Sequence, residues 1–200
     1  MGMTSTNIEI KASGLRQDGF CVFERDEAPL SQNEWSAVQN AVLGDPSRFI
    51  EVASGDTSEK TRVLVHRLLR DGAPPKPVDP QIADRLMAVI GSRKCMDLYE
   101  QILDKGPLMI RRAQAHILDT GGFIGRHVDS ESSPHYLAAV VLLLERAHEG
   151  GAFVIYRDEK EPLELTDFSM LITDADLPHE VLPVVAGRRC TLAFWLAQAQ

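Results

Sequence analysis

From residue 107 onward the chain consists of short apolar runs, and this pattern restricts the folds open to it. The runs are rich in β-branched residues and are separated by turn residues, as in antiparallel sheets. They cover residues 108–118, 137–145, 152–157, 163–165, 169–173, 180–185 and 190–196. Helical segments precede these strands, and that order predicts an α+β fold in which the strands close as a barrel or jelly roll.

The first half of the chain predicts the supporting elements. Ser31 and Glu34 form a capping box, which predicts the start of a helix that ends near Gly44. Apolar periodicity predicts further helices over 82–90 and 93–104, and short strands over 19–24 and 61–69. Residues 1–11 are polar and are expected to form a flexible tail.

Length and composition exclude several classes of protein. A chain of 200 residues fits one domain with a sizeable core, so residues 1–200 are expected to be a single domain. The formal net charge of -8 disfavours nucleic acid and anionic membranes as partners, because phosphate binding draws on a basic face. No apolar run reaches the roughly 18 residues that would span a bilayer. The start of the chain lacks a signal-peptide pattern and the three cysteines form no close pair, which indicates a reducing, cytoplasmic location.

Two histidines and one aspartate are candidate metal ligands. His127 and Asp129 are two residues apart, so in an extended strand both side chains point to one face. His179 begins a later predicted strand, and a jelly roll can bring the ends of such strands together. Two imidazoles and one carboxylate form the ligand set of a non-haem Fe(II) oxygenase, which leaves open positions on the metal. A bare His-x-Asp also occurs by chance, and four other histidines (His66, His116, His135 and His148) are available as alternatives.

A pair of arginines follows the second histidine. Arg188 and Arg189 offer a planar, permanently charged group that suits the carboxylate of a dicarboxylate co-substrate. Strand alternation turns one of the two inward and leaves the other as a solvated charge. Thr191 shares a strand face with Arg189 and can add a hydrogen bond to the same carboxylate.

Three segments together resemble the Fe(II)/2-oxoglutarate-dependent dioxygenase superfamily, specifically its prolyl 4-hydroxylase-like branch. Residues 121–129 are similar to the glycine-containing approach to His-x-Asp, and residues 149–153 to the Gly-Gly turn before a central strand. In residues 179–195, Arg189 stands ten positions after His179, with Gly187 two before it and Trp195 six after it. That spacing matches the branch's co-substrate arginine, so the resemblance assigns the role to Arg189 rather than Arg188.

The resemblance covers residues 107–197 and implies a double-stranded β-helix (jelly roll) core, supported by N-terminal helices. It implies that His127, Asp129 and His179 bind Fe(II), while Arg189 and Thr191 bind 2-oxoglutarate. O2 would be the oxidant, ascorbate an optional reductant, and succinate and CO2 the co-products. An aspartate at position 129 implies hydroxylation, or a related oxidation such as desaturation, rather than halogenation.

One position departs from the family pattern. Many relatives carry a co-substrate tyrosine about nine residues before the first metal histidine, where this chain has Ile117 and Leu118. The co-substrate pocket must therefore be completed differently. Tyr136 and Tyr156 are nearby in sequence, but each is expected to be a packing residue.

Several functions stay open at this point. The expected substrate is a small molecule, such as an amino acid or natural-product intermediate, or a short peptide, acted on by a monomer or homodimer. A peptidyl or protein prolyl hydroxylase is the first alternative. A cupin-like metalloenzyme without 2-oxoglutarate is the second, and it would give Arg189 and Thr191 no dicarboxylate to bind. A degenerate binding module and a nucleic-acid dealkylase are disfavoured, the first by the complete ligand set and the second by the acidic charge.

Overall fold

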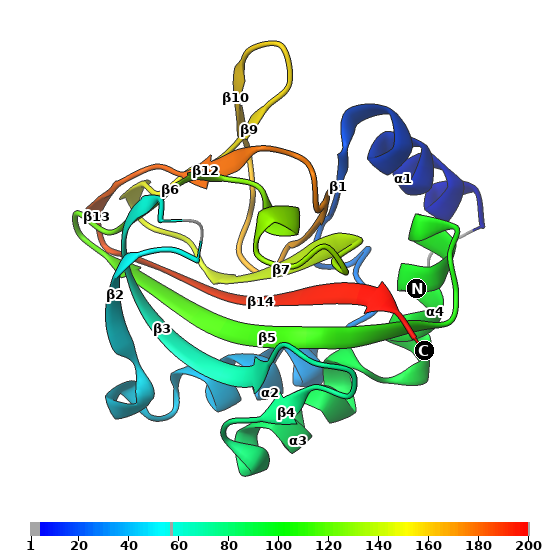
Figure 1. Cartoon of the computed structure of the whole chain (residues 1–200), viewed down its shortest axis with the longest axis horizontal. Coiled ribbons are helices and arrows are strands. Elements are labelled where there is room, and N and C mark those ends of the chain that lie inside the picture. The colour runs from blue at the N-terminus through cyan, green and yellow to red at the C-terminus, as the bar shows by residue number, and fades with distance from the viewer. Residues whose placement is uncertain (1–4, 57, 200) are drawn as a thin grey trace.

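The computed structural model describes residues 5–56 and 58–199. Helices form a layer outside a strongly curled antiparallel sheet, and the C-terminal half of the chain supplies most of the strands (Figure 1). The α-helices are α1 (Ser5–Asp18), α2 (Gln32–Leu43), α3 (Pro80–Ile90) and α4 (Arg93–Leu103), and two 3-10 turns, η1 (Pro46–Arg48) and η2 (Asp129–Glu131), accompany them.

The strands form one large antiparallel sheet and a small two-stranded one. The early strands are β1 (Phe20–Phe23), β2 (Ile50–Ser54), β3 (Lys60–Arg70), β4 (Lys76–Pro77), β5 (Leu108–Asp119) and β6 (Phe123–His127). The later strands are β7 (Ala138–Glu145), β8 (Glu149–Gly150), β9 (Phe153–Tyr156), β10 (Lys160–Leu163), β11 (Met170–Asp174), β12 (His179–Val181), β13 (Val184–Ala186) and β14 (Arg188–Gln198).

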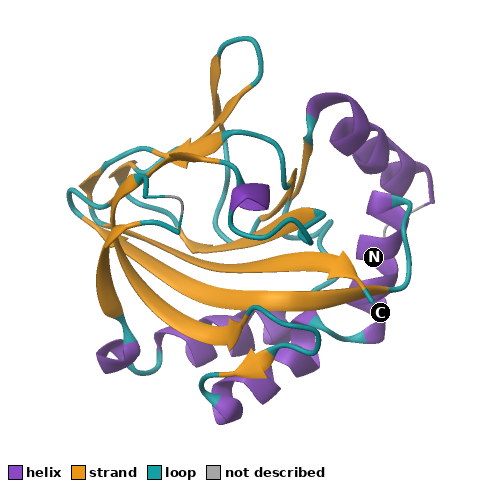
Figure 2. Ribbon diagram, viewed as in Figure 1, coloured by secondary structure: helices purple, strands orange, loops and turns teal. Residues whose placement is uncertain are grey.

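Strand β3 joins the two halves of the sheet. Its central residues pair with β5, which continues through β14, β7 and β11 to β1. Its first residues, Thr61 and Arg62, pair instead with β6, which continues through β12 and β9 to β10. The sheet therefore folds back on itself, and Figure 2 shows the long strands below the short ones. This is the predicted α+β fold with a double-stranded β-helix core, which the structure confirms.

Two apolar clusters hold these layers together. One lies between the helices and the long strands and includes Trp35, Tyr99 and Phe194, all almost fully buried. The other lies between the two halves of the sheet and includes Phe153 and Trp195. Alternating residues of β14 supply both clusters, because successive side chains of a strand point to opposite faces.

The N-terminal helices largely follow the sequence prediction. Ser31 and Glu34 form the expected capping box at α2, with the Ser31 hydroxyl accepting from the Glu34 N–H. Helices α3 and α4 lie over the two predicted periodic segments. The flexible tail predicted for residues 1–11 is wrong over 5–11, which form the first half of α1; Ala12 and Leu15 bury one side of that helix. Residues 1–4 lie outside the described part of the chain.

Two strand predictions need correction. The run predicted over 180–185 is two strands, β12 and β13, because Leu182 and Pro183 interrupt the pairing. The strand predicted over 163–165 lies earlier, at β10. Among the described residues, no helix is both long and apolar enough to cross a membrane.

Candidate metal centre

Three side chains converge inside the curled sheet at the ends of two paired strands. His127 ends β6 and His179 begins β12, and the two residues are direct partners in the antiparallel register. Asp129 follows at the start of η2. Each imidazole Nε2 lies 3.8 Å from an oxygen of the Asp129 carboxylate. Within the described chain these residues form the one cluster that could hold a metal, with all ligand atoms within 4.8 Å of one another.

The backbone turns both imidazoles toward the same point. Nδ1 of His127 lies 2.8 Å from the carbonyl oxygen of Gly125, and Nδ1 of His179 lies 2.8 Å from that of Leu177. Each Nδ1–H can donate to its carbonyl, which leaves Nε2 as the free lone pair that a metal needs. The rings lie 4.4 Å apart between centroids. The ligand atoms of the three side chains are close enough together for one metal ion to bind all three.

The approach to His127 depends on a glycine. A Cβ at Gly125 would lie 2.3 Å from the carbonyl oxygen of Lys60 on β3, so any larger residue would force β6 away. The strand ends at His127, two residues before Asp129, which the His-x-Asp argument placed in the same strand. Val128 nevertheless keeps an extended backbone (φ -123°, ψ 141°), and Asp129 therefore still points to the side of His127.

Burial sets the charge of the second histidine. His179 is 6% exposed and its ring stacks on Phe153 at 5.1 Å. Burial lowers the pKa of His179, although the neighbouring Asp129 carboxylate acts in the opposite direction. The imidazole is therefore neutral at physiological pH, which is the form that binds a metal.

An inner cavity of about 50 Å³ lies against the three side chains. Arg189 and Thr191 line it from β14, and they are 3% and 1% exposed. Among the described residues, Arg189 Nη2 and Thr191 Oγ1 have no hydrogen-bond partner. Buried polar groups are rarely left unpaired, and a buried guanidinium least of all. Two unpaired donors beside a metal-binding cluster fit a small ligand that carries a carboxylate.

Strand alternation separates the two arginines as predicted. Arg188 points out of the sheet and pairs with Glu145, with Nη2 2.8 Å from Oε2. Arg189 points inward, where burial lowers its pKa to about 10. At neutral pH it is still charged. The structure therefore brings Arg189, not Arg188, to the predicted ligands.

Neither tyrosine considered from the sequence lines the inner cavity. Tyr136 is buried and stacks on Trp195, with ring centroids 5.7 Å apart. Tyr156 lies on the outside, where its hydroxyl donates to Glu180 at 2.7 Å. Tyr136 is therefore a packing residue, as expected, whereas Tyr156 is a partly exposed residue with a polar contact.

His116 occupies the wall where a tyrosine is missing, and the sequence analysis did not single it out as a site residue. It lies opposite Thr191 across the β5–β14 ladder and lines the inner cavity. Its Nε2 is 2.8 Å from Nε2 of Gln114. Burial first, and then the charges of Arg189 and Arg112, lower its pKa to about 3. Polar residues at every second position of an otherwise apolar strand were the signal in the sequence that could have identified this wall.

The other histidines lie elsewhere. His66 is buried beside Phe49, with Nε2 3.7 Å from an Asp79 oxygen. His135 and His148 do not line the inner cavity. Of the four alternative histidines, only His116 therefore borders the three converging side chains.

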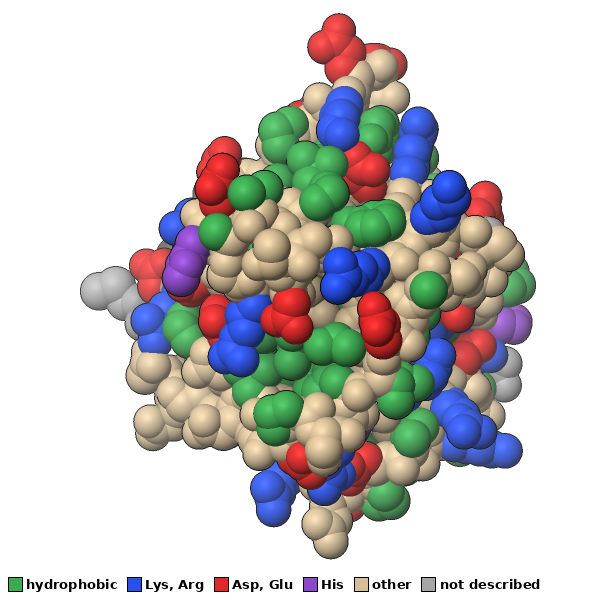
Figure 3. Space-filling view, turned by 90° about the vertical axis from the view of Figure 1, so that its left-hand side faces the viewer, with side chains coloured by type: hydrophobic (Ala, Val, Ile, Leu, Met, Phe, Trp, Pro, Cys, Tyr) green, Lys and Arg blue, Asp and Glu red, His purple; other side chains and the backbone are tan. Residues whose placement is uncertain are grey.

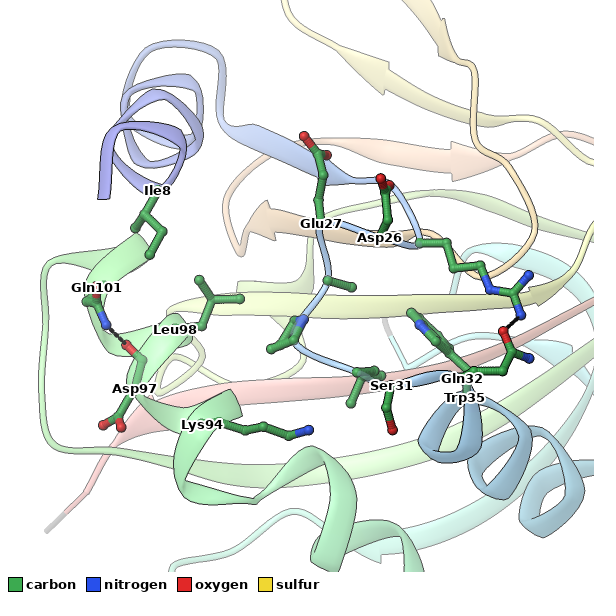
Figure 4. Close-up of a pocket in the computed structure, with 14 residues that line it drawn as sticks. Ile8, Asp26, Glu27, Ser31, Gln32, Trp35, Lys94, Asp97, Leu98 and Gln101 are labelled. Carbon is green, nitrogen blue, oxygen red and sulfur yellow. Dashed lines mark hydrogen bonds between the residues drawn. The ribbon is translucent and has the colours of Figure 1, made fainter. Parts of the chain in front are cut away.

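A larger hollow lies on the helical side of the molecule. Its volume is about 690 Å³, and Figure 4 shows Ile8 of α1, Trp35 of α2 and Leu98 of α4 around it. Lys94 at its rim pairs with Glu34 at 2.6 Å. Its lining includes no residue of the cluster formed by His127, Asp129 and His179. Size alone does not make it the reactive site, because it lacks convergent ligands.

Comparisons with known proteins agree with this location. Residues 113–197 match the model of the 2OG-Fe(II) oxygenase superfamily, a segment that contains all five predicted site residues. No curated protein matches the chain. The match agrees with the family and enzyme class predicted from the sequence, and the solved structures confirm the predicted fold.

Solved structures share the fold at low sequence identity. A 2OG-Fe(II) oxygenase family oxidoreductase from Burkholderia pseudomallei is 22% identical with a TM-score of 0.83, over 98% of this chain and 94% of that one. A prolyl-4-hydroxylase from Pseudomonas putida is 17% identical with a TM-score of 0.65, over 95% and 98%. The epimerase SnoN of nogalamycin biosynthesis, solved with Fe3+, alpha ketoglutarate and nogalamycin RO, is 12% identical with a TM-score of 0.74, over 98% and 85%.

Proposed function

Since residues 113–197 carry the pattern of the 2OG-Fe(II) oxygenase superfamily, we propose that this chain is an Fe(II)- and 2-oxoglutarate-dependent dioxygenase. It hydroxylates an unactivated C–H bond of a small molecule, such as an amino acid or natural-product intermediate, and releases succinate and CO2. The observation that carries the proposal is one shared cavity: the cluster of His127, Asp129 and His179 borders the same space as the unpaired donors of Arg189 and Thr191.

The metal side of the site is assigned to three residues. His127 and His179 offer Nε2 because the backbone holds their Nδ1 atoms, and Asp129 adds one negative charge. Iron held there together with 2-oxoglutarate would supply the activation of O2 that C–H oxidation requires, with ascorbate as a reductant. The aspartate fills a position that halogenation would need open, and this supports hydroxylation.

The co-substrate side is assigned to the β14 wall. Arg189 holds the distal carboxylate through a charge-assisted pair, and Thr191 donates a hydroxyl hydrogen bond to it. His116 stays neutral and so adds no charge to this wall at physiological pH. Ile124, Val141 and Phe153 complete the lining with apolar surface, which keeps water away from the reacting groups.

Two other functions compete with this one. Prolyl hydroxylases and an epimerase share the fold, and one fold supports many reactions, so fold likeness alone does not choose among them. A cupin-like enzyme that does not use 2-oxoglutarate would leave Arg189 and Thr191 as buried donors without a purpose. Their unpaired state therefore favours the oxygenase.

The proposed partners are small molecules or short peptides, for a cytoplasmic monomer or homodimer. Nucleic acid and membranes are not proposed as partners, since the chain has a net charge of -8. On the face shown in Figure 3, acidic and basic side chains are interspersed rather than gathered by sign. Such a surface offers no basic track for a phosphate backbone.

Turnover of 2-oxoglutarate tests the proposal. Purified protein is incubated with Fe(II), 2-oxoglutarate, ascorbate and O2, with and without a panel of amino acids and short prolyl peptides, and succinate is quantified. The expected result is succinate that depends on Fe(II) and increases with a substrate from the panel. Protein in which Zn(II) replaces Fe(II) is the matched control and should form none. An iron-loaded protein that never converts 2-oxoglutarate to succinate would reject the proposal.

A further inference from the structure

A second cavity, here called the outer cavity, lies next to the inner one and shares part of its lining. Its volume is about 100 Å³. Five residues line both cavities: His116, Ile124, His127, Asp129 and Trp195. A molecule in the outer cavity would therefore lie against the candidate metal ligands, where a substrate of the proposed reaction has to be.

One wall of the outer cavity is a row of polar side chains on β5. Arg112, Gln114 and His116 alternate along the strand and so share its inner face. Arg112 Nη2 donates to Gln114 Oε1 at 3.0 Å, and Gln114 Nε2 lies 2.8 Å from His116 Nε2. The Arg112 guanidinium also lies over the Trp195 ring, 5.0 Å from its centroid. These contacts hold the guanidinium in one orientation before any ligand arrives.

In the described part of the chain, one acidic side chain pairs with Arg112, and it comes from a hairpin turn. Its Nη1 pairs with Asp56, in the turn between β2 and β3. The Asp56 side chain is 48% exposed, whereas that of Arg112 is 16% exposed. Burial alone would lower the pKa of Arg112, but the Asp56 carboxylate outweighs it and the pKa is raised. Because the Asp56 carboxylate is half exposed and lies on a turn, a carboxylate that enters the cavity can take its place on Arg112.

A second guanidinium faces the same cavity. Arg67 of β3 lies opposite Gln114 in the β3–β5 register and also lines the outer cavity. Within the described part of the chain, it has no ion pair. The other carboxylate of the hairpin belongs to Glu59 and lies against Gly55, where an added Cβ would meet its Oε1 at 1.4 Å. Arg67 and Arg112 thus contribute two cations to the lining, although Arg67 is also exposed to solvent. The acidic residues of the lining are Asp56 and Glu59 on the turn, and Asp129, which the two cavities share.

We propose that the outer cavity binds a small organic acid, whose carboxylate takes the place of Asp56 on Arg112, with Arg67 as the second cation. In the ligand-free protein, the Asp56 carboxylate occupies the position on Arg112 that the carboxylate of the substrate would take. The oxidation of this acid rests on the proposed function. Its binding does not, because the binding argument uses only Arg112, Arg67 and Asp56.

Trp195 provides a local reporter of binding. The chain has two tryptophans, Trp35 and Trp195, so the indole N–H region of a 15N NMR spectrum holds two signals. Trp195 lies beneath Arg112, whereas Trp35 belongs to the helical layer and serves as an internal control. The probe is butyrate, and butyramide is its neutral isostere. Both are titrated into the protein, once without metal and once with Zn(II) and 2-oxoglutarate bound.

The expected result is a saturable shift of the Trp195 signal with butyrate and none with butyramide. Asp56→Asn removes the competing carboxylate and should tighten butyrate binding several-fold. Arg112→Gln should weaken it about tenfold or more, since a charge-assisted pair is lost. The matched control is Arg111→Gln, which alters the neighbouring arginine of β5, itself paired with Asp71 outside the cavity, and should leave binding unchanged.

Three results would overturn the proposal: no shift of Trp195 with butyrate, equal binding of butyramide, or Asp56→Asn without effect. The Asp56 variant keeps the test decisive if Arg112→Gln fails to fold, because Asp56 is in an exposed turn. Failure of the proposed function would appear separately, as absent succinate formation, and would leave the butyrate titration unaffected.

Discussion

Arg188 and Arg189 are adjacent in β14, yet their guanidinium groups lie in opposite environments. Arg188 is bound to Glu145 at the surface, with Nε 2.9 Å from Oε2. Arg189 is 3% exposed inside the sheet, and its Nη2 has no partner among the described residues. Substitution of Arg189 can therefore test co-substrate binding, and the same substitution of Arg188 is its control.

Replacing Arg189 with alanine should weaken 2-oxoglutarate binding. A lost charge-assisted hydrogen bond is worth about 1.5–3 kcal/mol, so Arg189→Ala should raise the KM for 2-oxoglutarate about 10- to 100-fold. Arg188→Ala should leave this KM unchanged and lower the free energy of unfolding by at most about 1 kcal/mol, since it removes a surface ion pair. Succinate formation at varied 2-oxoglutarate measures both. Equal effects of the two substitutions would contradict the assignment.

Thr191 should contribute to co-substrate binding but not to the stability of the ligand-free protein. Its Oγ1 is buried and unpaired among the described residues, so Thr191→Val removes a buried hydroxyl that stabilises nothing. The free energy of unfolding without ligand should be unchanged or higher. Affinity for 2-oxoglutarate should fall by about 0.5–1.5 kcal/mol, as for one neutral hydrogen bond. Thr191→Ser keeps the hydroxyl and should retain the affinity; a serine variant as weak as the valine variant would argue for a packing role.

Asp129 should link metal binding to stability. Its side chain is 4% exposed and its Oδ2 has no hydrogen-bond partner in the described chain, so without metal the carboxylate is a buried, poorly compensated charge. Asp129→Asn should leave the metal-free melting temperature equal or higher. It should also abolish most of the stabilisation that Fe(II) or Zn(II) gives, because one ligand is lost. Differential scanning calorimetry with and without EDTA separates the two effects. A variant that melts lower without metal would mean that Asp129 is mainly structural.

The capping box of α2 should make stability depend on pH. Burial would raise the pKa of Glu34, but hydrogen bonds from Lys94 and Ser31 outweigh it and lower the pKa from 4.5 to about 2. Because the folded pKa is the lower one, this stabilisation is complete above pH 4.5 and is lost as the pH falls toward 2. Glu34→Gln keeps a capping side chain but loses the charge that pairs with Lys94, so it should destabilise the protein by at most about 1 kcal/mol at pH 7. The difference from the parent should shrink below pH 4.5. Urea unfolding across this range measures it. A difference independent of pH would rule out the charge as its cause.

Local patterns predicted the helices and the central strands well, because each depends on nearby residues. The Ser31–Glu34 box marks the start of α2, and apolar runs mark β7 and β14. The first helix was missed because residues 5–11 are polar, and α1 gains its stability from packing of Ala12 and Leu15 against the rest of the fold. Local sequence patterns do not predict tertiary contacts of this kind.

The candidate site likewise has one part that local patterns indicated and another part that depends on the folded structure. The i, i+2 spacing and strand alternation proposed His127, Asp129 and one of the two arginines as candidates, and the family resemblance chose Arg189 and added His179. The wall of Arg112, Gln114 and His116 was not identified, because its meaning depends on β5 lying beside β14 and on Asp56 arriving from a distant hairpin. Which polar strand residues face a cavity is decided by the closure of the sheet.

A visible absorption spectrum shows whether the metal and 2-oxoglutarate bind together in one cavity of this chain, as we propose. Protein purified without oxygen is mixed with Fe(II) and then with 2-oxoglutarate, and the metal-to-ligand charge-transfer band is recorded for the parent, His179→Ala and Arg189→Ala. We expect a band in the parent, no band in His179→Ala, and in Arg189→Ala a band that needs about 10- to 100-fold more 2-oxoglutarate. A parent protein that binds Fe(II) but shows no band at saturating 2-oxoglutarate would rule out a shared site for the metal and the co-substrate.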